Sequence, residues 1–236
     1  MRLDDPEVVR AEYSTEVGLE ARRAAFATAT GPSALDVLFA AVAEAQPRSC
    51  LEVGCGPGQM AARIAEELRV ELVAIDISPR MVELARGRGV DARLGDVQEL
   101  PFADGSFDCA VAAWMLYHVP DLDRGLGELA RVLRPGGRLV ASTNSIDNMS
   151  ELWNLAGRTR RSEVTVFLAE NAEEPLQRHF GSVERRDVTG EMTFTRASAR
   201  DYVANSIAHG HLADRLPEFD EPLVVTRRMA IFVATR

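Results

Sequence analysis

The chain of 236 residues contains no lysine, so arginine supplies all 27 of its basic side chains. Without lysine the chain has no Walker A loop, whose Gly-Lys-Ser/Thr end holds nucleotide phosphates. Acidic residues number 36, and the resulting net charge of −9 argues against a surface that binds the phosphate backbone of a nucleic acid. We therefore expect no nucleic-acid partner.

Long apolar runs are absent as well. The longest, at residues 109–119, is too short to cross a bilayer, and the first residues lack the apolar core of a signal peptide. We expect a cytoplasmic protein with no membrane partner, either a monomer or a homodimer. Cysteine is scarce, and because Cys50, Cys55 and Cys109 lack the spacing of metal ligands, we predict buried thiols and no metal site.

Strand-like and helix-like segments alternate through the middle of the chain. The predicted strands are residues 50–53, 71–76, 92–95, 107–113 and 138–143, and the predicted helices are residues 60–69, 79–88 and 122–133. The apolar strands do not alternate with polar residues, which is typical of a parallel sheet covered on both faces. We predict an α/β fold: a Rossmann-like, seven-stranded, mostly parallel sheet with helices on both faces and a helical lid.

The two ends of the chain differ from this middle part. Residues 6–29 predict two short helices with a break near Gly18, and residues 34–45 predict a helix capped by Ser33. After residue 143 the predicted helices are residues 150–156, 175–180 and 198–208, and the predicted strands are residues 183–188 and 223–234. We expect one domain, in which residues 1–46 form cap helices, 47–143 the cofactor-binding core, and 144–236 the substrate lid and final strands.

A glycine-rich turn at residues 51–60, Leu-Glu-Val-Gly-Cys-Gly-Pro-Gly-Gln-Met, joins a predicted strand to a predicted helix. Its alternating glycines permit positive φ and a close approach of the backbone to a ligand. Asp76 ends the next strand about twenty residues later, the spacing at which a carboxylate reaches ribose hydroxyls. The alternative role of Asp76 is to cap the helix that begins at residue 79. The turn and the carboxylate together predict a nucleotide-type pocket.

The identity of the nucleotide depends on the end of this turn. A dinucleotide fingerprint needs glycine where the chain has Gln59, which disfavours a nicotinamide-dependent oxidoreductase. Residues 52–58, Glu-Val-Gly-Cys-Gly-Pro-Gly, instead resemble motif I of class I S-adenosylmethionine-dependent methyltransferases. Further segments match that family in order, at residues 74–81, 95–102, 107–108, 118–119 and 133–137. The chain is thus similar to the type 11 group of small-molecule methyltransferases over residues 51–140.

This resemblance implies S-adenosylmethionine as the cofactor. The positions that match cofactor-binding residues are Tyr13, Arg22, Glu52, Gly54, Cys55, Gly56, Gly58, Asp76, Ile77, Met81, Asp96, Val97, Ala113 and Trp114. In family terms the glycine turn carries the methionyl part, Asp76 the ribose, Ile77 and Met81 the adenine ring, and Asp96 the adenine edge. Tyr13 and Arg22 match residues that close over the cofactor, the alternative being a core tyrosine and a solvated arginine.

The reaction that the resemblance implies is methyl transfer to an oxygen or nitrogen nucleophile of a small molecule, with natural products as candidate acceptors. The alternative is a cofactor-binding protein of the same fold with non-methylating chemistry. A general base is needed only where the nucleophile arrives protonated. His118 and Tyr117, just after the fourth strand, are the catalytic candidates, although a structural or cofactor-side role is favoured for the histidine.

The acceptor-binding residues are expected after residue 143, where the matching motifs end. The aromatic candidates are Trp153, Phe167, Phe194 and Tyr202, for which the alternative is a lid core. The histidine candidates are His179, His209 and His211, and the arginine candidates, for which solvation is favoured, are Arg158, Arg160 and Arg161.

Overall fold

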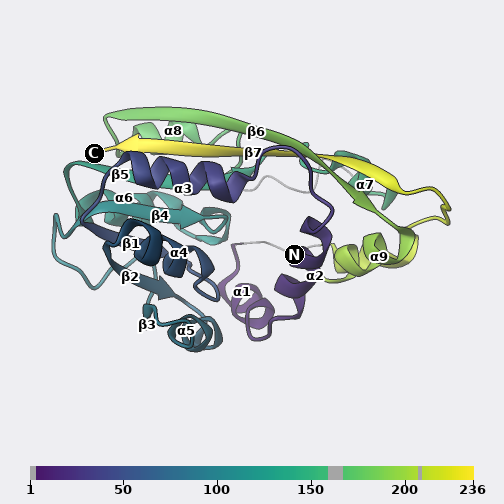
Figure 1. Cartoon of the computed structure of the whole chain (residues 1–236), viewed down its shortest axis with the longest axis horizontal. Helices are drawn as coiled ribbons and strands as arrows, with labels where there is room; N and C mark the ends of the chain where they lie inside the picture. Colours follow the sequence, from purple (N-terminus) through teal and green to yellow (C-terminus); the bar gives the residue numbers. More distant parts are fainter. Residues whose placement is uncertain (1–3, 159–166, 207–208) are drawn as a thin grey trace.

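The computed structural model describes residues 4–158, 167–206 and 209–236. Its centre is a seven-stranded sheet with the order β3-β2-β1-β4-β5-β7-β6 (Figure 1). The strands are β1 (Ser49–Val53), β2 (Glu71–Asp76), β3 (Asp91–Leu94), β4 (Phe107–Ala113), β5 (Leu133–Asn144), β6 (Ser182–Phe194) and β7 (Leu223–Thr235). Strands β1 to β5 pair in parallel, and β7 is antiparallel to both β5 and β6. The predicted fold class is confirmed.

Helices cover both faces of this sheet. The helices of the described chain are α1 (Pro6–Glu12), α2 (Val17–Phe26), α3 (Ala34–Glu44), α4 (Gln59–Leu68), α5 (Pro79–Arg86), α6 (Leu122–Val132), α7 (Ser150–Leu155), α8 (Glu173–Gln177) and α9 (Arg196–Ala204), with 3-10 turns η1 (Leu116–His118) and η3 (Gly210–Arg215). On one face α6 and α8 pack against Leu51 and Phe232, and on the other α3 and α4 pack against Cys50 and Val111. Because successive strand residues point to opposite faces, Cys50 and Leu51 belong to different cores.

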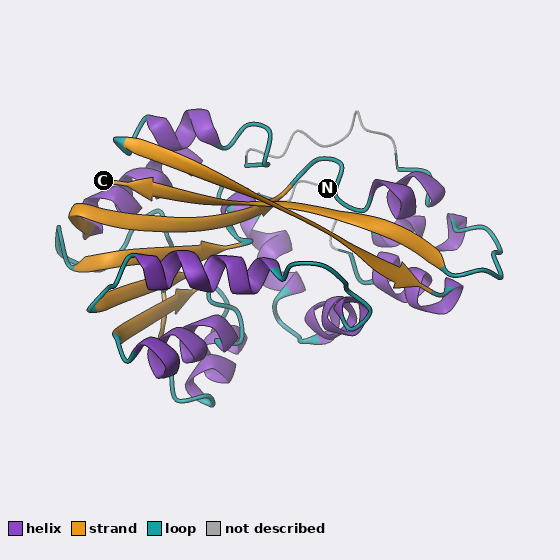
Figure 2. Ribbon diagram, turned by 45° about the horizontal axis from the view of Figure 1, so that its top comes forward, coloured by secondary structure: helices purple, strands orange, loops and turns teal. Residues whose placement is uncertain are grey.

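The last two strands are much longer than the parallel ones. The sequence predicts a strand at residues 183–188, but β6 continues to Phe194, paired with β7 along its whole length. The pairing of β5 with β7 ends at Asn144 and Met229, so residues 189–194 and 223–228 extend beyond the carboxyl edge of β5. Figure 2 shows this two-stranded extension reaching away from the rest of the sheet. The β6 half, residues 189–194, was missed because few apolar residues mark it, whereas the predicted strand at residues 223–234 includes the β7 half.

A lid core forms around the far end of this two-stranded extension. Met192 and Phe194 of β6 are fully buried there, together with apolar residues of α7, α9 and η3. Phe194 therefore belongs to the lid core and not to an acceptor pocket. Phe167 is also fully buried, with its ring centroid 6.2 Å from that of Phe232 in the sheet core.

The N-terminal helices break earlier than the sequence predicts. The break falls between Glu12 and Val17, and Gly18 lies inside α2 and is buried. A Cβ at Gly18 would lie 2.5 Å from Glu12 Oε1 and 3.4 Å from the carbonyl oxygen of Asn205. Glycine at this position thus permits close packing and does not end the helix. Among the described residues no helix is long and apolar enough to cross a membrane.

Candidate active site

A large cavity in the described part of the chain lies at the carboxyl ends of the parallel strands. Its volume is about 1030 Å³, at the upper end of the roughly 300–1,000 Å³ usual for ligand pockets. Strand β1 lies between β2 and β4, so the order of the sheet reverses at this point, which is where open α/β sheets bind ligands. The glycine turn, the N-terminal helices and the lid all contribute to the wall. The space is large enough for a cofactor and a second molecule.

The glycine turn adopts the left-handed conformation that the sequence predicts. The φ angles are +61° at Gly54, +52° at Gly56 and +77° at Gly58. A Cβ on Gly56 would meet nothing within 4 Å, so this glycine faces open space in the cavity wall. A Cβ on Gly58 would lie 2.7 Å from Ala85 Cβ, and Gly58 does not line the cavity. Its role in this structure is close packing against α5, while Gly54, Cys55 and Gly56 face the ligand space.

Asp76 connects the end of β2 to this turn. One carboxylate oxygen accepts a hydrogen bond from the Gly56 N–H at 2.8 Å, and the other accepts one from the Ser78 N–H at 2.8 Å. Burial raises the pKa of Asp76, and the backbone N–H groups partly oppose that rise. Ser78, not Asp76, caps α5, so the alternative role for Asp76 is wrong. Contact of its fixed carboxylate with ribose hydroxyls stays a prediction.

Glu52, at the floor of the cavity, has an unsatisfied oxygen. The residue is 2% exposed, and its Oε2 atom has no hydrogen-bond partner. Burial, and then the negative charge of Asp76, raises the pKa of Glu52 to about 8. A buried carboxylate oxygen without a hydrogen-bond partner is costly, so a cationic group placed here would be strongly favoured. The amino group of S-adenosylmethionine is such a cation, and the residues present fit this cofactor.

Most of the other predicted cofactor residues of the core line the same cavity. They are Ile77, Asp96, Val97, Ala113 and Trp114. Met81 is different, because it lies on the buried face of α5 and is fully inaccessible. It does not reach the cavity wall, so its predicted contact with the adenine ring finds no support in the structure.

The N-terminal helices bring Tyr13 and Arg22 to the cavity. The Tyr13 hydroxyl lies 3.2 Å from His118 Nε2, and their rings meet edge to face at 5.7 Å. Arg22 pairs with Glu12 at 3.4 Å. The Tyr13 carbonyl oxygen accepts a hydrogen bond from Ser78 Oγ at 2.8 Å, which ties α1 to the end of β2. These contacts hold the two helices against the part of the cavity wall that carries Asp76 and His118, and closure over the cofactor stays a prediction.

The two catalytic candidates, Tyr117 and His118, both lie on the wall, and their surroundings differ. Burial raises the pKa of Tyr117 well above its usual value, so its phenol stays protonated at neutral pH. Tyr117 can then donate a hydrogen bond but is a poor base. His118 contacts Tyr13 and is stacked edge to face on Tyr117 at 4.5 Å. This contact with the N-terminal segment is consistent with the structural or cofactor-side role, which stays a prediction.

The lid side of the wall contains both predicted and unpredicted residues. Trp153, Tyr202 and His209 line it, and the guanidinium carbon of Arg158 lies 5.1 Å from the Trp153 ring centroid. Arg158 is therefore a wall residue and not simply solvated, whereas Arg160 and Arg161 lie outside the described residues. Arg227 of β7 also lines the cavity and was missed, because no motif surrounds it and only the register of β7 places it there.

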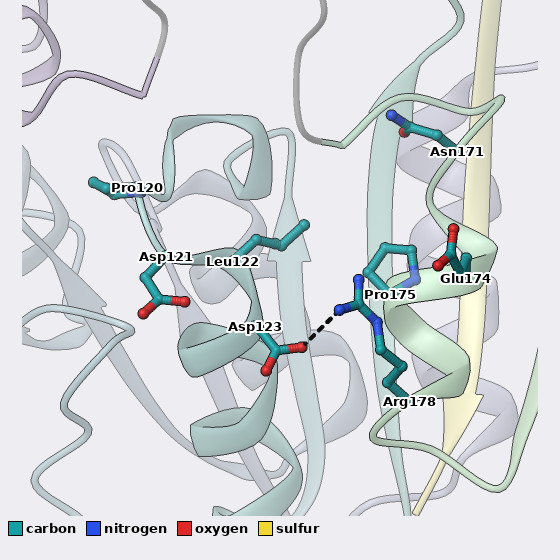
Figure 3. Close-up of a pocket in the computed structure, with 8 residues that line it drawn as sticks. All are labelled: Pro120, Asp121, Leu122, Asp123, Asn171, Glu174, Pro175 and Arg178. Atoms are coloured by element: carbon teal, nitrogen blue, oxygen red, sulfur yellow. Dashed lines mark ion pairs between the residues drawn. The ribbon is translucent and has the colours of Figure 1, made fainter.

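Two other histidine candidates lie elsewhere. A smaller cavity of about 570 Å³ lies between α6 and α8. Figure 3 shows Arg178 pointing toward Asp123 there, and the two side chains form an ion pair at 3.2 Å. His179 Nε2 lies 3.0 Å from the same Asp123, which places it in this ion-pair group outside the main wall. His211 lies on η3 and does not line the main cavity either. Of the lid histidines in the described chain, His209 alone reaches the candidate site.

Comparison with known proteins identifies the core. Residues 51–141 match the family model described as a methyltransferase domain. The 27-O-demethylrifamycin SV methyltransferase of Amycolatopsis mediterranei is 43% identical over 98 residues, which are 38% of this chain and 36% of that protein. The chain spans about a third of the length of the first curated relatives it matches, from 33% to 38%.

Solved structures share the fold over most of the chain. A SAM-dependent methyltransferase of Thermotoga maritima, described as a possible histamine N-methyltransferase, has a TM-score of 0.60 at 20% identity, covering 95% of this chain and 98% of that one. The [4+2]-cyclase SpnF has a TM-score of 0.59 at 22% identity, covering 86% of this chain and 79% of that one. Residues 51–141 of this chain thus match a methyltransferase domain, and the fold around them is the one that these solved structures share.

Proposed function

We propose that this protein transfers a methyl group from S-adenosylmethionine to an oxygen or nitrogen atom of a small molecule. When bound, the cofactor supplies a methyl group already activated on a sulfonium centre. The lone pair of the acceptor forms the new bond to carbon, while the electron pair of the broken carbon–sulfur bond remains on sulfur. The protein must therefore align the acceptor with that bond and exclude water.

The observation that carries this proposal is the composition of one wall of the cavity. The unpaired oxygen of Glu52, the open face of Gly56 and the fixed carboxylate of Asp76 lie along it, and each matches a different part of the cofactor. The cavity extends beyond this wall to Trp153 and Tyr202 of the lid, which leaves space for an acceptor. A protein that only bound a nucleotide would not need this second compartment.

The chain's own residues supply alignment and enclosure. The α1 and α2 helices cover the cofactor side through Tyr13 and Arg22, and α7 and α9 enclose the acceptor side. Tyr117, which stays protonated, can donate a hydrogen bond to an acceptor oxygen. An acceptor that arrives protonated needs a base, and His118 and His209 are the described histidines on the wall.

The acceptor class is part of the proposal. The relative from Amycolatopsis mediterranei acts, by its name, on a demethylated rifamycin, which supports a natural product as the acceptor. The aromatic side chains of Trp153 and Tyr202 also suit a molecule with apolar surface. A cytoplasmic location, and a monomeric or dimeric state, likewise remain proposals, and the second is tested by sedimentation at several concentrations.

The test is incubation with methyl-labelled S-adenosylmethionine and a panel of hydroxylated and aminated small molecules. The expected result is formation of S-adenosylhomocysteine in step with label in one acceptor. Tight binding of the cofactor with no S-adenosylhomocysteine formed, over a panel that includes natural-product precursors, would refute the methyltransferase proposal.

A second candidate is non-methylating chemistry on the same fold. The similarity to the [4+2]-cyclase SpnF is the observation that favours it, because that structure shares the architecture over 86% of this chain. The same incubation separates the two candidates. Conversion of a substrate that retains its mass, with the label left entirely in the cofactor, would establish the alternative.

Removing the Tyr13 hydroxyl tests the cover over the cofactor. The Tyr13→Phe change deletes the contact to His118 Nε2 at 3.2 Å and keeps the ring. A net hydrogen bond is worth about 0.5–1.5 kcal/mol, so we expect KM for S-adenosylmethionine to rise roughly 3- to 10-fold while kcat changes little. Steady-state kinetics at saturating acceptor measure both. A large loss of kcat with KM unchanged would instead give the Tyr13–His118 pair a catalytic role.

A further inference from the structure

Arg227 is a buried cation on the acceptor side of the cavity. The residue is 3% exposed and lines the wall. Its Nη2 donates a hydrogen bond to the Thr30 carbonyl oxygen at 2.5 Å, and its Nε donates one to the Glu191 carbonyl oxygen at 3.3 Å. Among the described residues no carboxylate lies within ion-pair distance of it, and its Nη1 group has no protein partner. The guanidinium is thus only partly compensated.

The backbone around Arg227 keeps the guanidinium in place. Arg227 lies directly opposite Gly190 on β6, and a Cβ on Gly190 would overlap the guanidinium and the Thr30 carbonyl oxygen. The Phe26 ring covers it at 5.7 Å from the guanidinium carbon to the ring centroid. A side chain held from three sides loses little conformational freedom when a ligand binds, which favours affinity.

The carboxylates of the cavity wall all lie on its core side. They are Glu52, Asp76 and Asp96, at the ends of β1, β2 and β3, and one cation, Arg63 of α4, belongs to the same part of the wall. On the opposite side, the charged wall residues are all arginines. They come from α2, the lid and the two-stranded extension, and they are Arg22, Arg23, Arg158 and Arg227. In a chain with a net charge of −9, a compartment without carboxylates is selective for anions.

We propose that Arg227 binds an anionic group of the acceptor, a carboxylate or a phosphate, and so selects acidic small molecules. This inference rests on the proposed function, since it names the class of acceptor that the same cavity takes. Guanidinium groups bind both oxyanions through paired N–H donors, and a buried cation without a counter-charge gains most from such a partner. Met229, two residues along the same strand face, also lines the cavity and packs in the same cluster as Trp114. The anion site therefore faces the same space as the methyl-transfer side of the wall.

The test uses three probes that share one ring and differ in one group: para-hydroxyphenylacetate, para-hydroxybenzylphosphonate and the neutral para-hydroxyphenylacetamide. Each is titrated calorimetrically into protein saturated with S-adenosylhomocysteine. We expect at least one anion to bind about 30-fold or more tighter than the amide, because loss of a buried charge partner costs about 2 kcal/mol or more. Which anion binds tighter distinguishes a carboxylate acceptor from a phosphate acceptor.

Substitutions at Arg227 test whether this residue causes the preference for anions over the amide. Arg227→Gln is expected to bring the anion-to-amide ratio close to one, and the matched control Arg228→Gln, from the next position on β7 and outside the wall, is expected to leave it unchanged. If Arg227→Gln does not fold, Arg227→Lys keeps the charge and loses the forked donors, and it should lower the ratio about threefold. Equal binding of the three probes to the wild type, no binding of either anion, or a ratio unaffected by Arg227→Gln would overturn the inference. Failure of S-adenosylhomocysteine itself to bind would instead refute the proposed function.

Discussion

Replacing Gly56 with alanine is expected to reduce kcat/KM for S-adenosylmethionine about 100-fold. The new Cβ would project from a residue with φ of +52° into open space on the cavity wall, where the turn must approach the ligand. It would also disturb the Gly56 N–H that donates to Asp76 at 2.8 Å, and so the carboxylate predicted to hold the ribose. Misplacement of a bound ligand by about 1 Å is enough for a loss of this size.

The matched control for this change is Gly136→Ala. Gly136 also has positive φ, +79°, and a Cβ there would likewise meet nothing within 4 Å, but it lies near the start of β5, away from the cavity. Both changes carry a similar backbone penalty of about 1–2 kcal/mol, which equilibrium unfolding in urea measures. Only Gly56→Ala should lose cofactor affinity. Equal cofactor binding by the two variants would contradict the role assigned to the turn.

Replacing Glu52 with glutamine is expected to change stability and cofactor affinity in opposite directions. The pKa of Glu52 is raised from 4.5 to about 8 in the folded protein without ligand. Between these values the folded state holds a proton that the unfolded state has lost, so the free energy of unfolding falls as pH rises toward 8. Glutamine removes this dependence. The variant should be more stable near pH 8 by an amount on the order of a few kcal/mol, since each pH unit is worth about 1.4 kcal/mol.

The same Glu52→Gln change should weaken cofactor binding, although it stabilises the fold. A ligand ammonium beside Glu52 favours the ionised carboxylate, so binding near pH 7 should release a proton, which calorimetry in buffers of different ionisation enthalpy detects. In the variant this proton release should vanish and affinity for S-adenosylmethionine should fall at least about tenfold. Glu71→Gln, at an exposed position at the start of β2, is the control. An unchanged affinity together with an unchanged pH profile would show that Glu52 does not contact the amino group.

The core was predictable because its signals are local. The glycine turn, the acidic end of β2 and the uninterrupted apolar strands each depend on neighbouring residues, and the structure has them at nearly the predicted boundaries. The prediction for Gly18 failed because glycine occurs both where helices break and where helices pack closely. Gly18 was interpreted as a helix break, but it allows α2 to pack closely against the chain at Asn205, and the break lies before it.

The acceptor side was not predictable for a different reason. Of the four aromatic candidates, Trp153 and Tyr202 reach the cavity. Phe167 is buried in the sheet core and Phe194 in the lid core. Helical and strand periodicity identifies which residues are buried, but it does not distinguish a side chain buried against protein from one that faces an internal cavity.

The sequence by itself determined the parallel α/β core, the site of the glycine turn and the cofactor family, because each follows from contacts between residues close along the chain. Only the tertiary structure decided which residues line the lid side of the cavity. Arg227 reaches the cavity because β7 pairs with β6 beyond the edge of β5 and because residue 30 folds back onto residue 191. Such contacts join segments almost 200 positions apart, and their register depends on the packing of the whole sheet and not on any local pattern.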